Sequence, residues 1–472
     1  MLQNNDKLPA VNMGNIRLTR DIIKTYFASG ERPKIEKIGM EIEKIGVRFP
    51  EGDPVSYKGN NGFLAILGKM YEELGWKITK QHGSYIYQMK RGNSILDLES
   101  DGRIELAGAP HSSLHDVVRE FRIHQNEMSE MSDVFGVSWL GIGYNPLANN
   151  DSIERLTDDG GRRDQIAAYR KELENKENNK YATEWSKGTA GIHVTLDYTS
   201  EKDFGKKSKV LFLLAPIMQA IFANSPFKNG EFSGQMNYRM FVAQKGVEKY
   251  ALSKKLFYSN FTYDDWIDFV CEKPALFFER GDKWIYPRTT FGDFLENGCD
   301  EEFPIEEDFH MHMKSIWADI RMRNTIEIRV FDSLPPSLVP SVPAFVKGIV
   351  YDEQNLNELY EMVNNWSFSE FEAMKAQIPR NGLNTVFRGE KVLDFAKKLL
   401  DMAEDGLKRN RTIDAHGNDE SVYLKPIKKF IFIEGCSPSH WLVKNWKGDW
   451  GQNFFPVFEW CKYGNSLHFM RL

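Results

Sequence analysis

The stretch SILDLESDGRIELAGAP, residues 94–110, decides the fold class of this chain. Apolar and polar side chains alternate on both sides of residues 100–102, which fit a three-residue hairpin loop with Gly102 in the left-handed conformation. This loop length places four ionisable side chains on one face of the hairpin, with Glu99 opposite Arg103 and Asp97 opposite Glu105. An ordinary solvent-facing hairpin shows the same alternation, so that alternative stays open.

A second acidic stretch lies upstream, in IGMEIEKIGV at residues 38–47. Glu41 and Glu43 are two positions apart on an expected strand, so both side chains project from the same face. A polar sheet face turned toward water gives the same pattern and remains an equal alternative for this pair.

A third stretch, RMRNTIEIRVFD at residues 321–332, combines both signs of charge. Alternation places Glu327 and Arg329 on one face of an expected strand, and Arg321 and Arg323 precede it. A lone Glu-x-Arg in a strand is usually a cross-strand ion pair. The functional hypothesis rests on several carboxylates and arginines all directed from strands.

The rest of the chain alternates expected strands with amphipathic helices, which predicts an α+β fold with an antiparallel sheet backed by helices. We expect helices at 61–75, from Ser113 onward and at 391–408, and strands at the following ranges: 35–49, 84–90, 94–99, 103–107, 137–142 and 190–198. No repeat or linker divides the chain. We therefore expect one domain over 1–472, with a lead-in at 1–30 and a mainly helical portion at 340–472.

Composition excludes several classes of protein. The 472 residues are 41% apolar and 27% charged with a net charge of −6, which excludes a disordered chain and argues against a general nucleic-acid binder. The longest apolar stretch, 210–223, is interrupted by Pro216 and Gln219, so we expect a buried helix there and no membrane partner. The polar N-terminus lacks the apolar core of a secretory signal, and we expect a cytoplasmic location.

Cysteine and histidine spacing gives no metal or disulfide signature. The four cysteines contain no CxxC pair; they are Cys271, Cys299, Cys436 and Cys461. His193 shares an expected strand face with Thr195 and Asp197, and a structural histidine is the more common explanation of such a position. Carboxylates without cysteine partners suit Mg²⁺, and nearby arginines suit phosphate. With no phosphate-binding glycine motif in the chain, we expect any ATP to bind on a sheet face.

Several motifs resemble plant-type and proteobacterial glutamate–cysteine ligases, in the same order along the chain. They are IGMEIEK, LDLESDGRIELAGAP, LGIGYNP, IFANSPFKNG, HMKSIWADIRMRNTIEIRVFD, PAFVKGIVYDEQNL and GCSPSHWLVKNWKGDW. The resemblance covers roughly residues 30–462. Its most specific part is the Glu-x-Glu strand followed by the E-x-A-G-A-P hairpin.

This resemblance implies a fold and a reaction. The family has a glutamine synthetase-like catalytic fold, with a curved antiparallel sheet that holds Mg²⁺ and ATP. It phosphorylates the γ-carboxylate of glutamate, and the cysteine amine then attacks the acyl phosphate to give γ-glutamylcysteine, the first step of glutathione synthesis. The expected partners are therefore the small molecules glutamate, cysteine and ATP. The sequence does not indicate an oligomeric state.

The resemblance also implies roles for individual residues. Five glutamates fall on the metal-holding positions of the family: Glu41, Glu43, Glu99, Glu105 and Glu327. Arg321 and Arg329 fall on basic positions near the phosphates, and with Glu327 they are the expected catalytic residues. Arg239 is a candidate for binding the α-carboxylate of glutamate, and His193 stands at a second expected substrate-binding position, where plant-type members usually have Gln.

One region departs from the family pattern. Residues 237–258 read NYRMFVAQKGVEKYALSKKLFY, and the acidic-basic run of plant-type members is absent there. Two alternatives to a glutamate–cysteine ligase follow: a same-fold ligase that uses another amine or carboxylate, and a non-catalytic relative that binds a ligand. The retained carboxylates argue against the second, because like charges that converge without a cation repel one another.

Overall fold

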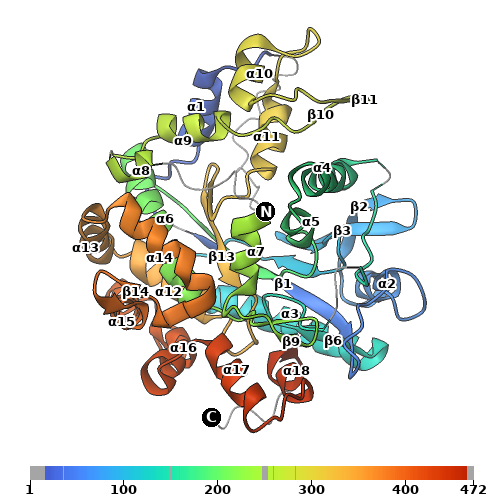
Figure 1. Cartoon of the computed structure of the whole chain (residues 1–472), viewed down its shortest axis with the longest axis vertical. Coiled ribbons are helices and arrows are strands. Elements are labelled where there is room, and N and C mark those ends of the chain that lie inside the picture. Colours follow the sequence, from blue (N-terminus) through green and yellow to red (C-terminus); the bar gives the residue numbers. More distant parts are fainter. Residues whose placement is uncertain are drawn as a thin grey trace.

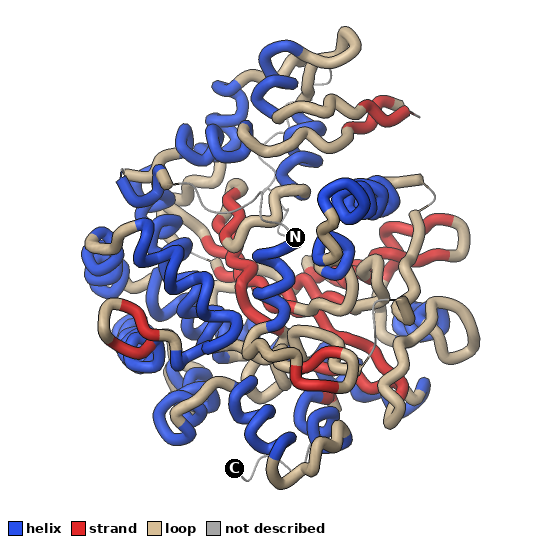
Figure 2. Tube along the Cα trace, in the orientation of Figure 1, coloured by secondary structure: helices blue, strands red, loops and turns tan. Residues whose placement is uncertain are grey.

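A computed structural model gives the fold of the chain and describes residues 16–464, apart from 36, 148–150, 159, 247–253, 259 and 282. A ten-stranded sheet lies at the centre of the described part (Figures 1 and 2). Its main path runs β12-β13-β7-β1-β5-β4-β3-β2, and β6 pairs with both β1 and β16. All of these pairs are antiparallel, as the hairpin stretches predicted.

The strands of the central sheet have the following bounds: β1 Ile38–Arg48, β2 Lys77–His82, β3 Tyr85–Arg91, β4 Ser94–Leu98, β5 Ile104–Ala107, β6 Val137–Leu140, β7 Gly191–Leu196, β12 Ile320–Met322, β13 Ile326–Asp332 and β16 Lys462–Tyr463. Among the described residues, three two-stranded hairpins lie outside it: β8 Phe227–Lys228 with β9 Glu231–Phe232, β10 Phe278–Arg280 with β11 Lys283–Ile285, and β14 Val386–Phe387 with β15 Glu390–Lys391.

The helices of the described part have the following bounds: α1 Arg20–Ala28, α2 Phe63–Glu73, α3 Leu114–Phe135, α4 Arg162–Glu177, α5 Tyr181–Glu184, α6 Glu201–Ile221, α7 Tyr238–Gly246, α8 Lys255–Tyr258, α9 Tyr263–Cys271, α10 Phe291–Asn297, α11 Glu306–Lys314, α12 Ser341–Val350, α13 Glu353–Asn364, α14 Phe368–Asn381, α15 Val392–Asn410, α16 Lys425–Lys428, α17 Pro438–Lys447 and α18 Phe455–Cys461. Short turns of other helix types are Gly382–Asn384, Glu420–Leu424 and Lys429–Glu434.

The hairpin that decides the fold forms with the expected register. Asp97 pairs with Glu105 across β4 and β5, and the backbone N–H of Glu99 donates to the carbonyl of Arg103 at 2.8 Å. Gly102 has φ +82°, a conformation that glycine adopts without strain. The three-residue loop therefore places the acidic side chains of both strands on one face.

Pairing across the sheet brings the acidic stretches together. Glu41 of β1 lies opposite His193 of β7, and Glu43 lies opposite Glu105 of β5. Glu327 of β13 lies opposite Thr195 of β7. Apart from the buried Lys44 of β1, the alternate side chains of these strands are apolar and pack toward α3, α6 and α12, whereas α7 lies on the acidic side. One face of the sheet therefore packs into the hydrophobic core, and the other face carries the acidic residues of the candidate site.

The long apolar stretch forms part of α6, which begins at the N-cap Ser200 and contains Pro216. Nearly every side chain from Phe204 to Ile221 is buried, and the helix packs on β12 and β13. Among the described residues, no helix combines the length and apolarity that crossing a bilayer requires. This stretch is a core helix, as predicted.

The C-terminal portion is mainly helical but also contributes to the sheet. β16 adds a strand beside β6, with Tyr463 opposite Trp139. The buried Glu420 accepts a hydrogen bond from the backbone N–H of Leu114 at 2.6 Å and forms an ion pair with Lys347 at 2.6 Å. Leu114 and Glu420, more than 300 positions apart in the chain, thereby hold the start of α3 against the C-terminal helical portion.

Candidate active site

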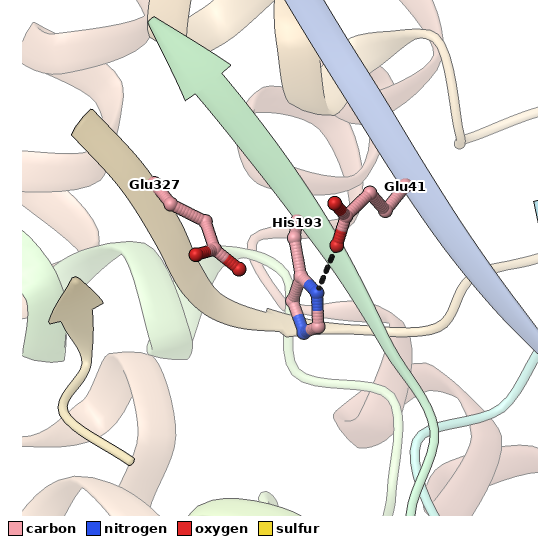
Figure 3. Close-up of side chains that lie close together, drawn as sticks. All are labelled: Glu41, His193 and Glu327. Atoms are coloured by element: carbon pink, nitrogen blue, oxygen red, sulfur yellow. Dashed lines mark hydrogen bonds and ion pairs between the residues drawn. The ribbon is translucent and has the colours of Figure 1, made fainter. Parts of the chain in front are cut away.

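Three potential metal ligands converge from three neighbouring strands of the sheet. Glu41, His193 and Glu327 each offer one ligand atom, and these atoms all lie within 4.8 Å of one another. Figure 3 shows their side chains directed toward one another from β1, β7 and β13. Nδ1 of His193 and Oε2 of Glu41 are 2.9 Å apart in a hydrogen bond. Two carboxylates and one imidazole at this spacing can hold a divalent cation.

Glu327 lies at the centre of a buried arginine cluster. Arg321 donates to both of its oxygens, from Nε at 2.7 Å and from Nη2 at 2.8 Å, and Arg329 also donates to it. Burial opposes ionisation of Glu327, but Arg321 and Arg329 outweigh it and hold its pKa well below the ordinary range. Glu327 is therefore a carboxylate at neutral pH, in the form that binds a cation.

His193 is neutral in this environment. Burial lowers the pKa of its imidazole, and the nearby Arg329 lowers it further. A neutral imidazole is the form that binds metal ions. Whereas the sequence left a structural role as the more common explanation, the structure places His193 between two carboxylates.

A second acidic group surrounds Glu105 beside this cluster. Burial raises the pKa of Glu105 well above the ordinary value, and the carboxylates of Glu41, Glu99, Glu43 and Asp97 raise it further. Within the described part of the chain, no hydrogen bond or ion pair to the Glu105 side chain is formed. A carboxylate that faces four others and has no hydrogen-bonded cation suits a site for a metal ion.

Glu43 has different partners from those expected of a metal ligand. Its Oε1 accepts from Arg103 at 3.1 Å, and its Oε2 accepts from the backbone N–H of Gly191 at 2.5 Å. Arg103 also donates to Asp101 at 2.7 Å. Burial opposes ionisation of Glu43, but Arg103, His193, Arg239 and the Gly191 backbone together outweigh it and lower the pKa. The protein itself therefore compensates the charge of Glu43, and no Glu43 oxygen belongs to the group of Glu41, His193 and Glu327 atoms that lie within 4.8 Å of one another.

A cavity of about 320 Å³ lies between α7, α14, residues 317–319 before β12, and Arg329 of β13, which donates to Glu327 of the cluster. Two expected residues, Arg239 and Arg329, line it together with Trp185 and Trp317. The Arg239 guanidinium lies 5.5 Å from the Trp185 ring centroid and donates from Nη2 to the carbonyl of Arg329 at 3.1 Å. Cations beside aromatic walls suit a small zwitterion with a carboxylate. The divergent stretch contributes α7 to this cavity, and its residues 247–253 lie outside the described residues.

The structure adds cations that the sequence patterns did not indicate. Burial lowers the pKa of Lys314, and the cations Arg162, Lys80, Arg323 and Arg321 lower it further. Arg162 begins α4 and donates to the carbonyl of Lys314 at 3.0 Å. The signal in the sequence is only Gly-Gly-Arg-Arg at 160–163, which does not reveal what it packs against. Clustered cations next to an acidic site suit a polyphosphate.

Comparison with known proteins assigns the family. The profile of glutamate–cysteine ligase family 2 matches residues 37–454, which is most of the chain. The chain belongs to this family. The fold and the enzyme class expected from the sequence motifs, an ATP-dependent ligase with an antiparallel sheet and covering helices, are confirmed.

Individual relatives agree with this assignment. The chain is 28% identical over 452 residues to the chloroplastic glutamate–cysteine ligase of Arabidopsis thaliana, covering 94% of this chain and 83% of that one. It is 28% identical to ligase B of Oryza sativa subsp. japonica, covering 94% and 88%. The glutamate–cysteine ligase of Francisella tularensis, solved in complex with AMP, superposes with a TM-score of 0.52 at 13% identity, covering 91% and 88%.

The comparisons correct one expectation. The plant ligases of this family that match the chain are chloroplastic. The cytoplasmic location expected from the polar N-terminus is therefore wrong by this comparison. The physical reason is that the composition of a terminus reports only one kind of targeting segment, the apolar secretory signal, and is silent on others.

Proposed function

We propose that this chain joins the γ-carboxylate of glutamate to the amine of cysteine at the expense of ATP, the first step of glutathione synthesis. Membership of glutamate–cysteine ligase family 2 supports the reaction class. The observation that carries the proposal is the convergence of Glu41, His193 and Glu327 beside a cavity lined by Arg239 and Arg329. Such an arrangement brings cation ligands and carboxylate-binding groups to one place.

The residues present fit Mg²⁺. The carboxylate of Glu105, whose pKa four neighbouring carboxylates raise, and the three donor atoms within 4.8 Å both favour a divalent cation. We propose Glu41, His193 and Glu327 as ligands of one ion, and Glu105 with Glu99 as ligands of a neighbouring one. Bound Mg²⁺ supplies charge neutralisation for a transferring phosphoryl group. Glu43 is left out because none of its oxygens belongs to the group of donor atoms within 4.8 Å of one another, and Arg103 and Gly191 bind them.

The first chemical step activates the acid. An oxygen of the glutamate γ-carboxylate attacks the γ-phosphorus of ATP, the bond from that phosphorus to the bridging oxygen breaks, and ADP leaves. Arg321 and Arg329 lie beside Glu327, where their guanidinium groups stabilise negative charge on the phosphoryl oxygens. The cations Arg162 and Lys314 extend this positive surface toward the rest of the nucleotide phosphates.

The second step forms the amide bond. The cysteine amine attacks the acyl carbon of the γ-glutamyl phosphate, the bond from carbon to the phosphate oxygen breaks, and inorganic phosphate leaves while the amine loses a proton. We propose that Arg239 holds the glutamate α-carboxylate, because its guanidinium lines the cavity next to Arg329. No nucleophilic side chain is needed, because ATP supplies the activation.

The test is a product assay. Purified protein is supplied with ATP, Mg²⁺, glutamate and a panel of amino acids, and products are identified by mass together with the released nucleotide. We expect γ-glutamylcysteine, ADP and phosphate in equal amounts. A rate with cysteine no higher than with other amines would show that the acceptor is a different amine. Absence of any ATP-dependent product would show that the chain is a non-catalytic relative that binds a ligand.

A substitution in the cavity tests the placement of glutamate. We expect Arg239→Ala to raise the KM of glutamate at least about tenfold and to change the KM of ATP far less, because a buried charge-assisted hydrogen bond is lost at one substrate only. Equal effects on both KM values would show that the glutamate site lies elsewhere.

A further inference from the structure

A buried aspartate that none of the sequence patterns indicated lies behind the cavity. Asp332 ends β13, three residues after Arg329, and has 0% exposure. Its Oδ2 accepts hydrogen bonds from the backbone N–H of Asn224 and from the hydroxyl of Ser225, each at 2.7 Å. Within the described part of the chain, its Oδ1 has no donor. A buried carboxylate oxygen without a donor is costly, so its position needs a physical reason.

The guanidinium of Arg239 lies opposite that oxygen. Nη1 of Arg239 is 3.9 Å from Oδ1 of Asp332, which is an ion pair without a hydrogen bond. Nε of Arg239 also lacks an acceptor among the described residues. Burial lowers the pKa of Arg239, and Asp332 is the strongest influence that opposes this. Asp332 therefore compensates the charge of Arg239 without using up its N–H donors.

A second connection runs through Ser225. The Ser225 hydroxyl donates to Asp332 at 2.7 Å, and its oxygen accepts the backbone N–H of Arg239 at 3.2 Å. Asp332 thus acts on Arg239 both at the guanidinium and at the backbone of the first turn of α7.

Two glycines make room for this pair. A Cβ at Gly191 would overlap the guanidinium of Arg239, and a Cβ at Gly143 would overlap the carboxyl group of Asp332. The backbone of β7 and of the loop after β6 therefore allows one close-fitting arrangement of the two side chains.

We propose that Asp332 is the positioning residue for Arg239, holding the guanidinium at the cavity wall with free donors for the substrate carboxylate. This rests on the proposed function, in which Arg239 binds the α-carboxylate of glutamate. Asp332 itself touches no substrate, since it is wholly buried. Its effect is on the binding of one substrate and not on phosphoryl transfer.

The decisive variant is Asp332→Asn, which keeps the shape and removes the charge. We expect the KM of glutamate to rise about tenfold, the loss typical of one interaction with a charged group, with kcat and the KM of ATP changed less than about twofold. In an Arg239→Ala background the same change is expected to have no further effect on the KM of glutamate, because the two residues act as one unit.

Ser225→Ala gives a second route should Asp332→Asn not fold. It removes the hydroxyl link and leaves the carboxylate, so we expect a smaller rise of about threefold in the KM of glutamate alone. The matched control is Asp352→Asn at the N-cap of α13, where Arg409 donates to both aspartate oxygens at 2.9 and 2.7 Å. That variant loses a partly buried aspartate–arginine pair too, and we expect lower stability with unchanged KM values.

The outcomes separate the two claims. Equal rises in the KM of glutamate and ATP, a fall in kcat alone, or additive effects of Asp332→Asn and Arg239→Ala would each overturn the role of Asp332 while the ligase activity stands. Absence of ATP-dependent product in the wild-type protein with every amino acid tested would overturn the proposed function, and with it this inference.

Discussion

Glu43 and Glu105 lie opposite each other on adjacent strands, yet the protein treats them in opposite ways. Glu43 is buried and Glu105 is partly buried, and burial alone would raise both pKa values. Arg103, with His193, Arg239 and the Gly191 backbone, reverses this for Glu43, whereas the strongest charged influences on Glu105 are four carboxylates that raise its pKa further. The comparison teaches that Arg103 and the Gly191 backbone occupy the oxygens of Glu43, whereas the described part of the chain offers the oxygens of Glu105 no such partner and leaves them available to a cation.

Of the substitutions that test this difference between Glu43 and Glu105, the one at Glu105 is expected to have the largest effect, and that effect is on catalysis. Glu105→Gln removes a proposed Mg²⁺ ligand, and we expect ATP turnover to fall at least about a hundredfold, because several kcal/mol of charge stabilisation are lost. Steady-state release of phosphate measures it, with circular dichroism to verify the fold. Rates similar to the wild type would remove Glu105 from the metal site.

Glu43→Gln is the matched variant on the neighbouring strand. It removes one of the two carboxylates that pair with the buried guanidinium of Arg103. We therefore expect the free energy of unfolding to fall by roughly 3 kcal/mol. Urea denaturation without nucleotide or Mg²⁺ measures this. A stable Glu43→Gln protein that has lost Mg²⁺ dependence would instead return Glu43 to the set of metal ligands.

A smaller effect concerns pH and the metal-free protein. The pKa of Glu105 is raised in the folded state, so its contribution to stability is full at acidic pH, below the pKa of the unfolded chain, and is lost as the pH rises through the folded-state value. We therefore expect Glu105→Gln to raise the Tm of the metal-free protein at neutral pH and to reduce this pH dependence.

Added Mg²⁺ sharpens the same test. We expect it to raise the Tm of the wild type at neutral pH, where ligand binding to the folded state stabilises it, and to raise that of Glu105→Gln far less. Thermal melts across a Mg²⁺ titration measure both proteins. Equal shifts for the two would mean that the ion binds away from Glu105.

Local sequence rules were sufficient for the hairpin and for much of the sheet. The three-residue loop at 100–102 determined that Asp97 lies opposite Glu105, because loop length sets the register and register sets the face. The strand over Glu41 and Glu43 and the strand over Glu327 also formed within the expected ranges. These features depend on residues close together in the chain.

The partners of the same residues could not be predicted in this way. Arg103 was expected only to share a face with the acidic residues, yet it neutralises Glu43, because the pairing of β1 with β5 brings them together across 60 positions. His193 lies beside Glu41 because β7 pairs with β1. Neither pairing has a signal in the local sequence.

The sequence alone determined the class of fold, the acidic face and, through its motifs, the family, because strand periodicity, turn chemistry and motif order are properties of short stretches. Only the tertiary structure decided which carboxylates are compensated, which cations gather near the site and how Asp332 faces Arg239. Electrostatic roles depend on distance in space, and the fold places next to one another charges that lie far apart along the chain.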